Sequence, residues 1–160
     1  MLSALSFSEV DRAGTRVLTC RFAGRTCALP LVNIIETMRP LPIDTLAGAP
    51  AFVLGVAVVR GTPVPVVDAR RLFGVPTGDA TRWVTLRVAS RMVALAVDSV
   101  VGVNMVPREE LRELPPLLAH AAAGAIDALG TADSELLIVL QTARLVPDEV
   151  LAVELRGAAT

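Results

Sequence analysis

The sequence predicts an all-β protein built from two similar strand-rich units, each closing into a small barrel. The chain is 53% hydrophobic but only 3% aromatic and contains no Tyr. Its apolar residues are therefore mainly Val, Leu, Ile and Ala, a mixture that favours strands. Short apolar runs alternate with Gly- and Pro-containing turns, and parts of the chain recur. Closing each unit into a barrel would remove exposed strand edges.

The internal repeat consists of three blocks that recur in the same order. Residues 25–35 match 91–101 at an offset of 66, 55–62 match 124–131 at an offset of 69, and 66–73 match 139–146 at an offset of 73. We therefore expect one domain over residues 16–156, with barrels at about 16–80 and 81–146. A loosely ordered lead-in is expected at 1–15 and a terminal helix at about 147–155.

The first unit is expected to contain strands at 16–22, 26–31, 52–59 and 64–67, with apolar sequence continuing through 32–38. Ala23-Gly24 predicts a tight turn, and Gly61-Thr62-Pro63 predicts another. Two prolines make 39–43 an extended connector. Asp68 fits the N-cap of a short helix at 69–73, with Gly74 as its C-cap.

The second unit follows a polar connector at 76–80. Its expected strands lie at 83–88, 92–97, 100–106, 122–129 and 135–140. Residues 107–114 are expected to form one or two helical turns, because Pro107 suits the first helical position and acidic residues follow it.

Cys20 and Cys27 would face each other across the hairpin that turns at Ala23-Gly24. They could form a disulfide or two buried thiols. Each alternates with apolar neighbours, and the cytosol is reducing, so buried thiols are the favoured interpretation.

Charge and hydropathy exclude several classes of function. The net charge is −1 and the basic residues are scattered arginines, so nucleic-acid binding is not indicated. The longest apolar runs are strand-sized, too short to span a bilayer, and the first twelve residues lack the features of a secretory signal. A cytoplasmic protein is expected.

The residue types also argue against an enzyme. His120 is the only histidine, there is no Lys, and no phosphate-binding or nucleophile motif occurs. Asp68 and Asp98 occupy non-equivalent positions of the repeat, so they do not indicate a catalytic pair. We expect no catalytic residue, no metal and no cofactor.

Residues 55–74 carry a distinctive pattern: a Gly, an apolar strand ending in Arg60-Gly61, then Pro65-Val66-Val67-Asp68. Upstream stand Ala28-Leu29-Pro30, Glu36 and Pro50-Ala51-Phe52; downstream stand Val97-Asp98 and residues 135–146. Together these features resemble the CheW-like domain family over about residues 15–150.

The resemblance implies two intertwined five-stranded SH3-like barrels with short helices. It also implies a non-enzymatic adaptor that couples chemoreceptors to a CheA-type histidine kinase in signalling arrays. One face would pair with the regulatory domain of the kinase. The groove between the barrels would take the cytoplasmic tip of a methyl-accepting chemoreceptor, without insertion into the membrane.

The expected partner-binding residues are Ile34, Glu36, Val56, Val58, Val59, Arg60 and Gly61, with Ile35 also in the apolar trough. Gly55, Asp68 and Gly74 are expected to be structural. Alternatively, Arg60 is a strut that hydrogen-bonds loop carbonyls, and Glu36 is only an exposed charge on a strand. Gly61 suits turn geometry, and the apolar stripe could be core.

Two positions depart from the family pattern: Val58 replaces a usual Asn, and Ala69 replaces a Leu. They leave open a divergent paralogue that binds receptor but not kinase, in a motility or development pathway. A third hypothesis is a small-molecule-binding or hydrolytic barrel, which would need a closed polar pocket around Asp98 or His120. In the repeat alignment, Leu129 stands for Arg60 and Gln141 for Asp68, so the charged features belong to the first unit.

Overall fold

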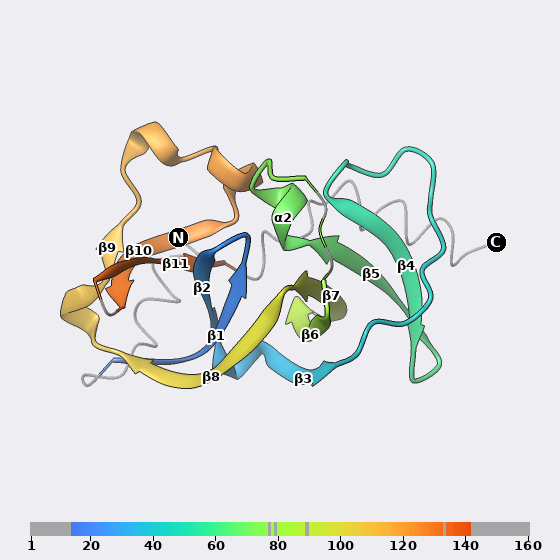
Figure 1. Cartoon of the computed structure of the whole chain (residues 1–160), viewed down its shortest axis with the longest axis horizontal. Coiled ribbons are helices and arrows are strands. Elements are labelled where there is room, and N and C mark those ends of the chain that lie inside the picture. The colour runs from blue at the N-terminus through green and yellow to red at the C-terminus, as the bar shows by residue number, and fades with distance from the viewer. Residues whose placement is uncertain (1–13, 77, 79, 89, 133, 142–160) are drawn as a thin grey trace.

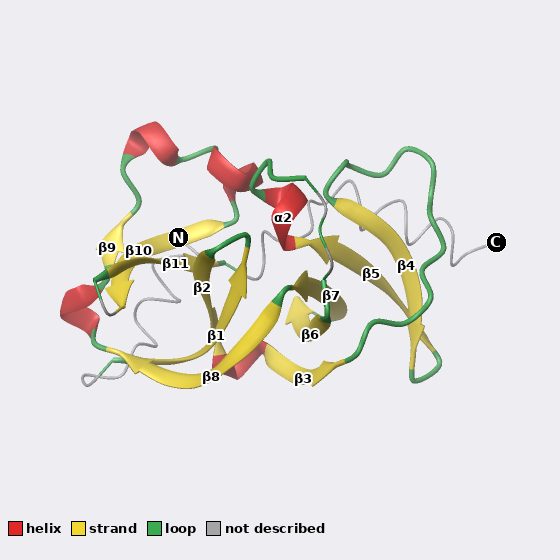
Figure 2. Ribbon diagram, viewed as in Figure 1, coloured by secondary structure: helices red, strands yellow, loops and turns green. Residues whose placement is uncertain are grey.

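The structure is a computed structural model that describes residues 14–76, 78, 80–88, 90–132 and 134–141. Within these residues the protein consists of two β-sheets and several short helical turns (Figure 2). The all-β class is confirmed. The terminal helix expected at 147–155 lies outside the described residues. So does the lead-in expected at 1–15, except for residues 14 and 15.

Two sheets lie side by side along the long axis of the molecule (Figure 1). The first has the strand order β8-β1-β2-β11-β10-β9 and the second the order β3-β6-β7-β5-β4. The strands of the first sheet are β1 Thr15–Phe22, β2 Arg25–Pro30, β8 Ser99–Val106, β9 Arg112–Glu113, β10 Ile126–Ala132 and β11 Glu135–Leu140. Those of the second are β3 Ile34–Met38, β4 Val53–Val59, β5 Thr62–Asp68, β6 Arg82–Val88 and β7 Arg91–Val97.

Short helical turns connect the strands: η1 Leu31–Asn33, α2 Ala69–Leu72, η2 Arg108–Glu110, η3 Pro116–Leu118 and η4 Ala121–Gly124. Three local predictions need correction. The turn between β4 and β5 is Arg60-Gly61, because β5 already starts at Thr62. Only η2 is helical within 107–114, since β9 pairs with β10, and β10 begins at Ile126 rather than at residue 122.

The two sheets do not coincide with the two sequence units. The third strand of each unit crosses to the other sheet, so that β3 pairs with β6 and β8 pairs with β1. The second sheet is therefore the contiguous segment β3–β7, inserted between β2 and β8 of the first. The expected division near residue 80 falls inside the second sheet, and the exchanged strands are what intertwines the two halves.

The strand registers show which parts of the repeat are structural. The parallel pair β5–β7 aligns Val66 with Ala94, and the parallel pair β11–β2 aligns Val139 with Ala28. These pairings agree with the offsets of 66 and 73. The β-bulges also lie at equivalent positions. Ile35 of β3 has no partner in the pairing with β6, and Val101 of β8, which is 66 residues later, has no partner in the pairing with β1.

The predicted alignment of residues 55–62 with 124–131, at an offset of 69, is wrong. The β4–β5 hairpin closes on Val59 opposite Thr62, and the β10–β11 hairpin closes on Ala132 opposite Glu135, an offset of 73. Because the turn sets the register of a hairpin, the counterpart of Arg60 is position 133 and not Leu129. Leu129 lies inside strand β10.

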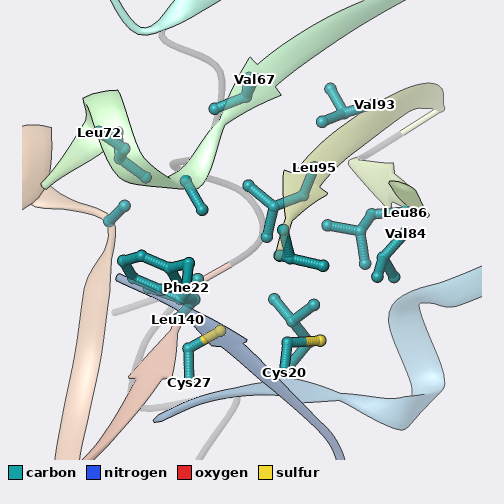
Figure 3. Packing of buried hydrophobic residues seen from close by; sticks show 14 of the residues in the cluster. Cys20, Phe22, Cys27, Val67, Leu72, Val84, Leu86, Val93, Leu95 and Leu140 are labelled. Atoms are coloured by element: carbon teal, nitrogen blue, oxygen red, sulfur yellow. The ribbon is translucent and has the colours of Figure 1, made fainter. Parts of the chain in front are cut away.

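Three apolar clusters hold the sheets together. One lies within each sheet, and the largest, the shared core, combines residues from both sheets (Figure 3). Strand β7 shows the principle, since Val93 and Leu95 enter the shared core while Ala94 and Ala96 enter the core of the second sheet. Strands buried on both faces cannot show simple polar alternation, which explains much of the mean hydropathy of +0.60.

Cys20 and Cys27 lie opposite each other on β1 and β2, both buried in the shared core, and both are free thiols. The favoured prediction of buried thiols is thus confirmed. The hydrogen bond with Cys20, followed by burial, raises the pKa of Cys27 well above its ordinary value, so the thiol stays protonated and poorly reactive.

The connector between β3 and β4 covers the outer edge of the second sheet. The Asp44 N–H donates to Val56 O at 2.8 Å, and the Val56 N–H donates to Asp44 O at 2.8 Å. Gly55 makes this approach possible, because a Cβ on it would lie 2.2 Å from Asp44 O. The backbone of Gly55 also has φ +145°, a region that disfavours other residues.

Gly55→Ala is expected to lower the free energy of unfolding by several kcal/mol, because it combines backbone strain with a backbone clash. Gly48→Ala is the matched control, since Gly48 also has positive φ but nothing lies within 4 Å of its Cβ position. The control should cost only about 1 kcal/mol. Urea unfolding measures both; equal losses would show that the Asp44 contact is not what requires glycine.

Asp127 and Leu54 occupy equivalent positions of the repeat. Each lies at the β-bulge of its hairpin, Asp127 in β10–β11 and Leu54 in β4–β5. Leu54 packs against the core of the second sheet, whereas a buried carboxylate oxygen of Asp127 has no hydrogen-bond partner among the described residues. Burial raises the pKa of Asp127. The folded protein then binds this proton more tightly than the unfolded chain, so stability falls as pH rises from the unfolded-state to the folded-state pKa.

Asp127→Leu is therefore expected to raise the free energy of unfolding at neutral pH by about 1 kcal/mol, by removing a half-buried unpaired polar group. It should also remove the fall in stability that begins as pH rises above the unfolded-state pKa of Asp127. Glu109→Leu, at an exposed carboxylate of η2, is the control. Denaturant unfolding at several pH values measures both effects, and a destabilised Asp127→Leu protein would contradict the prediction.

Candidate partner-binding site

Arg60 and Gly61 form the two-residue turn between β4 and β5, with φ of 49° and 81°. A turn with two positive φ angles suits the twist of a hairpin, but its first position usually carries Asn, Asp or Gly. Gly61 therefore has the predicted turn role. An arginine in this conformation is uncommon, although the equivalent turn of the β1–β2 hairpin has Ala23 at the same position.

The Arg60 guanidinium forms a two-pronged ion pair with Glu36. Its Nε donates to Oε1 at 3.0 Å and its Nη2 donates to Oε2 at 2.8 Å. Glu36 lies on β3 and Arg60 at the tip of the β4–β5 hairpin, and β3 and β4 are the two edge strands of the second sheet. The ion pair therefore connects opposite edges of one sheet.

A β-bulge and a buried hydroxyl orient Glu36. Its N–H donates to Thr85 Oγ1 at 3.1 Å, and this hydroxyl donates back to Glu36 O at 3.1 Å. The bulge leaves the side chain of Ile35 38% exposed beside Glu36. Sequence reasoning missed Thr85, although a lone Thr within the apolar run Trp83–Leu86 was an available signal.

The ion pair shifts the pKa of both groups. The hydrogen bond and charge of Arg60 lower the pKa of Glu36, and Glu36 raises the pKa of Arg60. The Arg60 side chain nevertheless remains 77% exposed, against 29% for Glu36. The pair is a surface feature that holds the guanidinium in one orientation while leaving it accessible to solvent.

The other predicted contact residues divide by exposure. Val58 is 61% exposed, Gly61 is exposed and Val56 is half-buried, all on or beside the same hairpin. Val59 is only 1% exposed and lies in the core of the second sheet, so its assignment as a contact residue is wrong. Strand alternation points Val59 inward where Val58 points outward. Ile34 packs against the shared core, so it too is mainly structural.

Neither alternative role matches the geometry as stated. Arg60 makes its described hydrogen bonds to a carboxylate rather than to loop carbonyls, and Glu36 is an ion-pair acceptor rather than a lone strand charge. Asp68 has its predicted role, whereas the C-cap of α2 is Phe73 rather than the predicted Gly74. Asp68 Oδ1 accepts from Arg70 N at 3.0 Å as the N-cap of α2, and Gly74 follows the helix with φ of 73°.

The structure contains a second two-pronged ion pair that was not predicted from the sequence. Arg70 on α2 binds both carboxylate oxygens of Asp98, at 3.0 and 2.8 Å. Arg70 lowers the pKa of Asp98, and the Ala23 N–H contributes in the same direction. The sequence placed Asp98 within a family-like motif but gave no sign of its partner, 28 residues away.

Two hollows lined by described residues, of about 700 and 430 Å³, lie around β1, β8, β9 and β10, and neither is lined by Asp98 or His120. Within the described residues there is no group of three or more His, Cys, Asp or Glu side chains placed to hold a metal ion. No described helix is long and apolar enough to cross a membrane.

The family model of the CheW-like domain matches residues 16–150. The chain belongs to this family. It is 29% identical over 154 residues to chemotaxis protein CheW of Klebsiella aerogenes, covering 94% of this chain and 93% of that protein. It is 30% identical over 127 residues to protein FrzA of Myxococcus xanthus, covering 72% and 79%.

Two further matches extend the comparison. Chemotaxis protein CheA of Cereibacter sphaeroides is 35% identical over 86 residues, which cover 48% of this chain and 12% of that protein. The crystal structure of scaffolding protein TtCheW from Thermoanaerobacter tengcongensis superposes with a TM-score of 0.72 at 19% identity, covering 82% of this chain and 92% of that one. The structural match supports the fold of paired barrels.

Replacing Arg60 by Gln is expected to raise the pKa of Glu36 toward its ordinary value, because the charge and the two-pronged hydrogen bond are both lost. Side-chain carboxyl shifts in an NMR titration measure this. Arg87→Gln, at an exposed arginine of β6, is the control and should leave the titration of Glu36 unchanged. An unaltered Glu36 titration in Arg60→Gln would show that the ion pair does not persist in solution.

Proposed function

We propose that this chain is a non-enzymatic chemosensory adaptor that couples chemoreceptors to a CheA-type histidine kinase. Membership of the CheW-like family and the likeness to a CheW along almost its whole length support this function. Recruitment from the cytoplasm to receptor arrays is part of the same proposal. The observation that carries the site is the exposed Glu36–Arg60 ion pair.

The receptor-binding surface would comprise Ile35, Glu36, Val58, Arg60 and Gly61. Exposed apolar side chains flank the ion pair, as a helical hairpin would require from a shallow docking surface. Glu36 holds the guanidinium through two of its five N–H groups, so others point to solvent. Those donors can bind a carboxylate or a free carbonyl at a receptor tip.

The proposal of kinase binding is based on the similarity between this chain and part of a CheA kinase. The match to 12% of a CheA supports the presence of a related domain within the kinase. Two similar barrel domains can pair through equivalent surfaces, as in pseudo-symmetric assemblies. The regulatory domain of the kinase is therefore the proposed second partner.

A specialised paralogue is the second candidate, favoured by Val58. This exposed valine stands where the family usually has Asn, so the surface beside Arg60 lacks a polar group. The similarity to FrzA of Myxococcus xanthus is compatible with such a variant. A paralogue of this kind would bind the receptor and not the kinase.

Arg60→Ala is expected to weaken binding to the receptor tip by tenfold or more, as for loss of a charge-assisted hydrogen bond, while the fold is retained. Isothermal titration against the cognate receptor tip and, separately, the kinase regulatory domain measures this. Arg87→Ala is the matched control, because it removes the same side-chain type from another strand of the second sheet.

The outcomes separate the hypotheses. Binding of the wild-type protein to both partners supports the coupling adaptor, and binding to the receptor alone supports the paralogue. Absence of binding to either partner would sink the proposal. If circular dichroism shows that Arg60→Ala unfolds, Arg60 is a structural strut instead.

A further inference from the structure

The chain passes between the two sheets at Asp98, which stands between β7 and β8. Three hydrogen bonds converge on its carboxylate. Arg70 Nε donates to Oδ1 at 3.0 Å, Arg70 Nη2 donates to Oδ2 at 2.8 Å, and the Ala23 N–H donates to Oδ2 at 2.9 Å. The Asp98 N–H also donates to Arg21 O at 2.9 Å.

These donors come from different sheets. Arg70 belongs to α2, which continues directly from β5 of the second sheet, whereas Ala23 is in the turn of the β1–β2 hairpin of the first. Apolar contacts follow the same path. The rings of Phe22 and Phe73 lie 4.9 Å apart, and the Arg25 guanidinium sits 5.9 Å from the centre of the Phe73 ring. Asp98 is the point at which both sheets are tied to one crossover.

Partial burial makes this ion pair more effective than one at the surface. The side chains of Arg70 and Asp98 are 25% and 28% exposed, whereas the Arg60 side chain is 77% exposed. A charge-assisted, two-pronged hydrogen bond fixes direction as well as distance. The hydrophobic attraction within the shared core is not directional, so this ion pair adds a contact of defined direction between elements of the two sheets.

The other crossover between the sheets, from β2 to β3, is built differently. It runs through η1, which has no side-chain cap and no buried residue. The counterpart of Asp98 there, at the offset of 66, is Val32, whose side chain is 79% exposed. Of the two described crossovers, only the one at Asp98 carries this clamp.

We propose that the Arg70–Asp98 ion pair, with the Ala23 N–H, is a clamp that sets the orientation of the two sheets relative to each other. Arg70 and Asp98 are then positioning residues: they fix the angle between the receptor-binding surface on the second sheet and any surface on the first. Only this last consequence rests on the proposed coupling function. The orientation itself is testable without a partner.

Spin labels at Glu113→Cys on β9 and Arg82→Cys on β6 report the distance between the sheets, and the native thiols are buried. Pulsed electron resonance should give one narrow distance distribution for the otherwise unchanged protein. With Arg70→Gln or Asp98→Asn it should become broader with a shifted mean. Arg87→Gln is the control and should leave it narrow. A narrow, unshifted distribution in folded Arg70→Gln would overturn the proposal.

Arg70→Lys is the alternative variant if Arg70→Gln is too unstable to measure. It keeps the charge but not the two-pronged geometry, so its distance distribution is expected to be intermediate in width. A Lys variant as narrow as wild type would also count against the clamp. In a separate measurement, Arg70→Gln should retain binding to each partner alone but lose affinity for the second when the first is bound. If neither partner binds the wild-type protein, the coupling function fails while the distance measurement still decides the clamp.

Discussion

The apolar core shared between the two sheets is the constraint on which the remaining structure depends. Strands β1, β2 and β11 of the first sheet, and β5, β6 and β7 of the second, each send side chains into it as well as into their own sheet. A sheet with both faces apolar cannot remain exposed in water. Each sheet thus requires the other, and exchange of β3 and β8 makes the association part of the chain's topology.

The two copies of the repeat share one pattern of strand pairing, and several of their equivalent positions carry different residues. Leu54 fills a core where Asp127 leaves an unpaired oxygen. Glu36 holds a guanidinium where its counterpart, Gly102, has no side chain. Asp98 ties both sheets where Val32 is exposed. Shared features such as the parallel pairs and the bulges belong to the common scaffold, whereas the proposed receptor-binding surface and the proposed clamp both lie at positions where the copies differ.

Local features were accessible from the sequence, whereas long-range pairing was not. The Ala23-Gly24 turn, the cap at Asp68 and the buried thiols each depend on a few neighbouring residues and were predicted correctly. Within the candidate site, Glu36, Val58 and Arg60 were proposed through the family pattern, but Val59 was assigned to the wrong face, because adjacent residues of a strand point to opposite sides and Val58 takes the outer one. The exchange of β3 and β8 and the Arg70–Asp98 pair depend on distant contacts that no local pattern encodes.

Stability does not explain an arginine at position 60. A two-residue hairpin turn with positive φ favours Asn or Gly, so Arg is a poor choice for the backbone. Its ion pair with Glu36 is solvent-exposed, and such pairs contribute little to folding. The same carboxylate does, however, hold the guanidinium in one orientation while it stays accessible, which lowers the entropy lost when a partner binds. An exposed guanidinium that is unfavourable for its turn yet held in one orientation is the geometry that the proposed receptor-binding role of Arg60 requires.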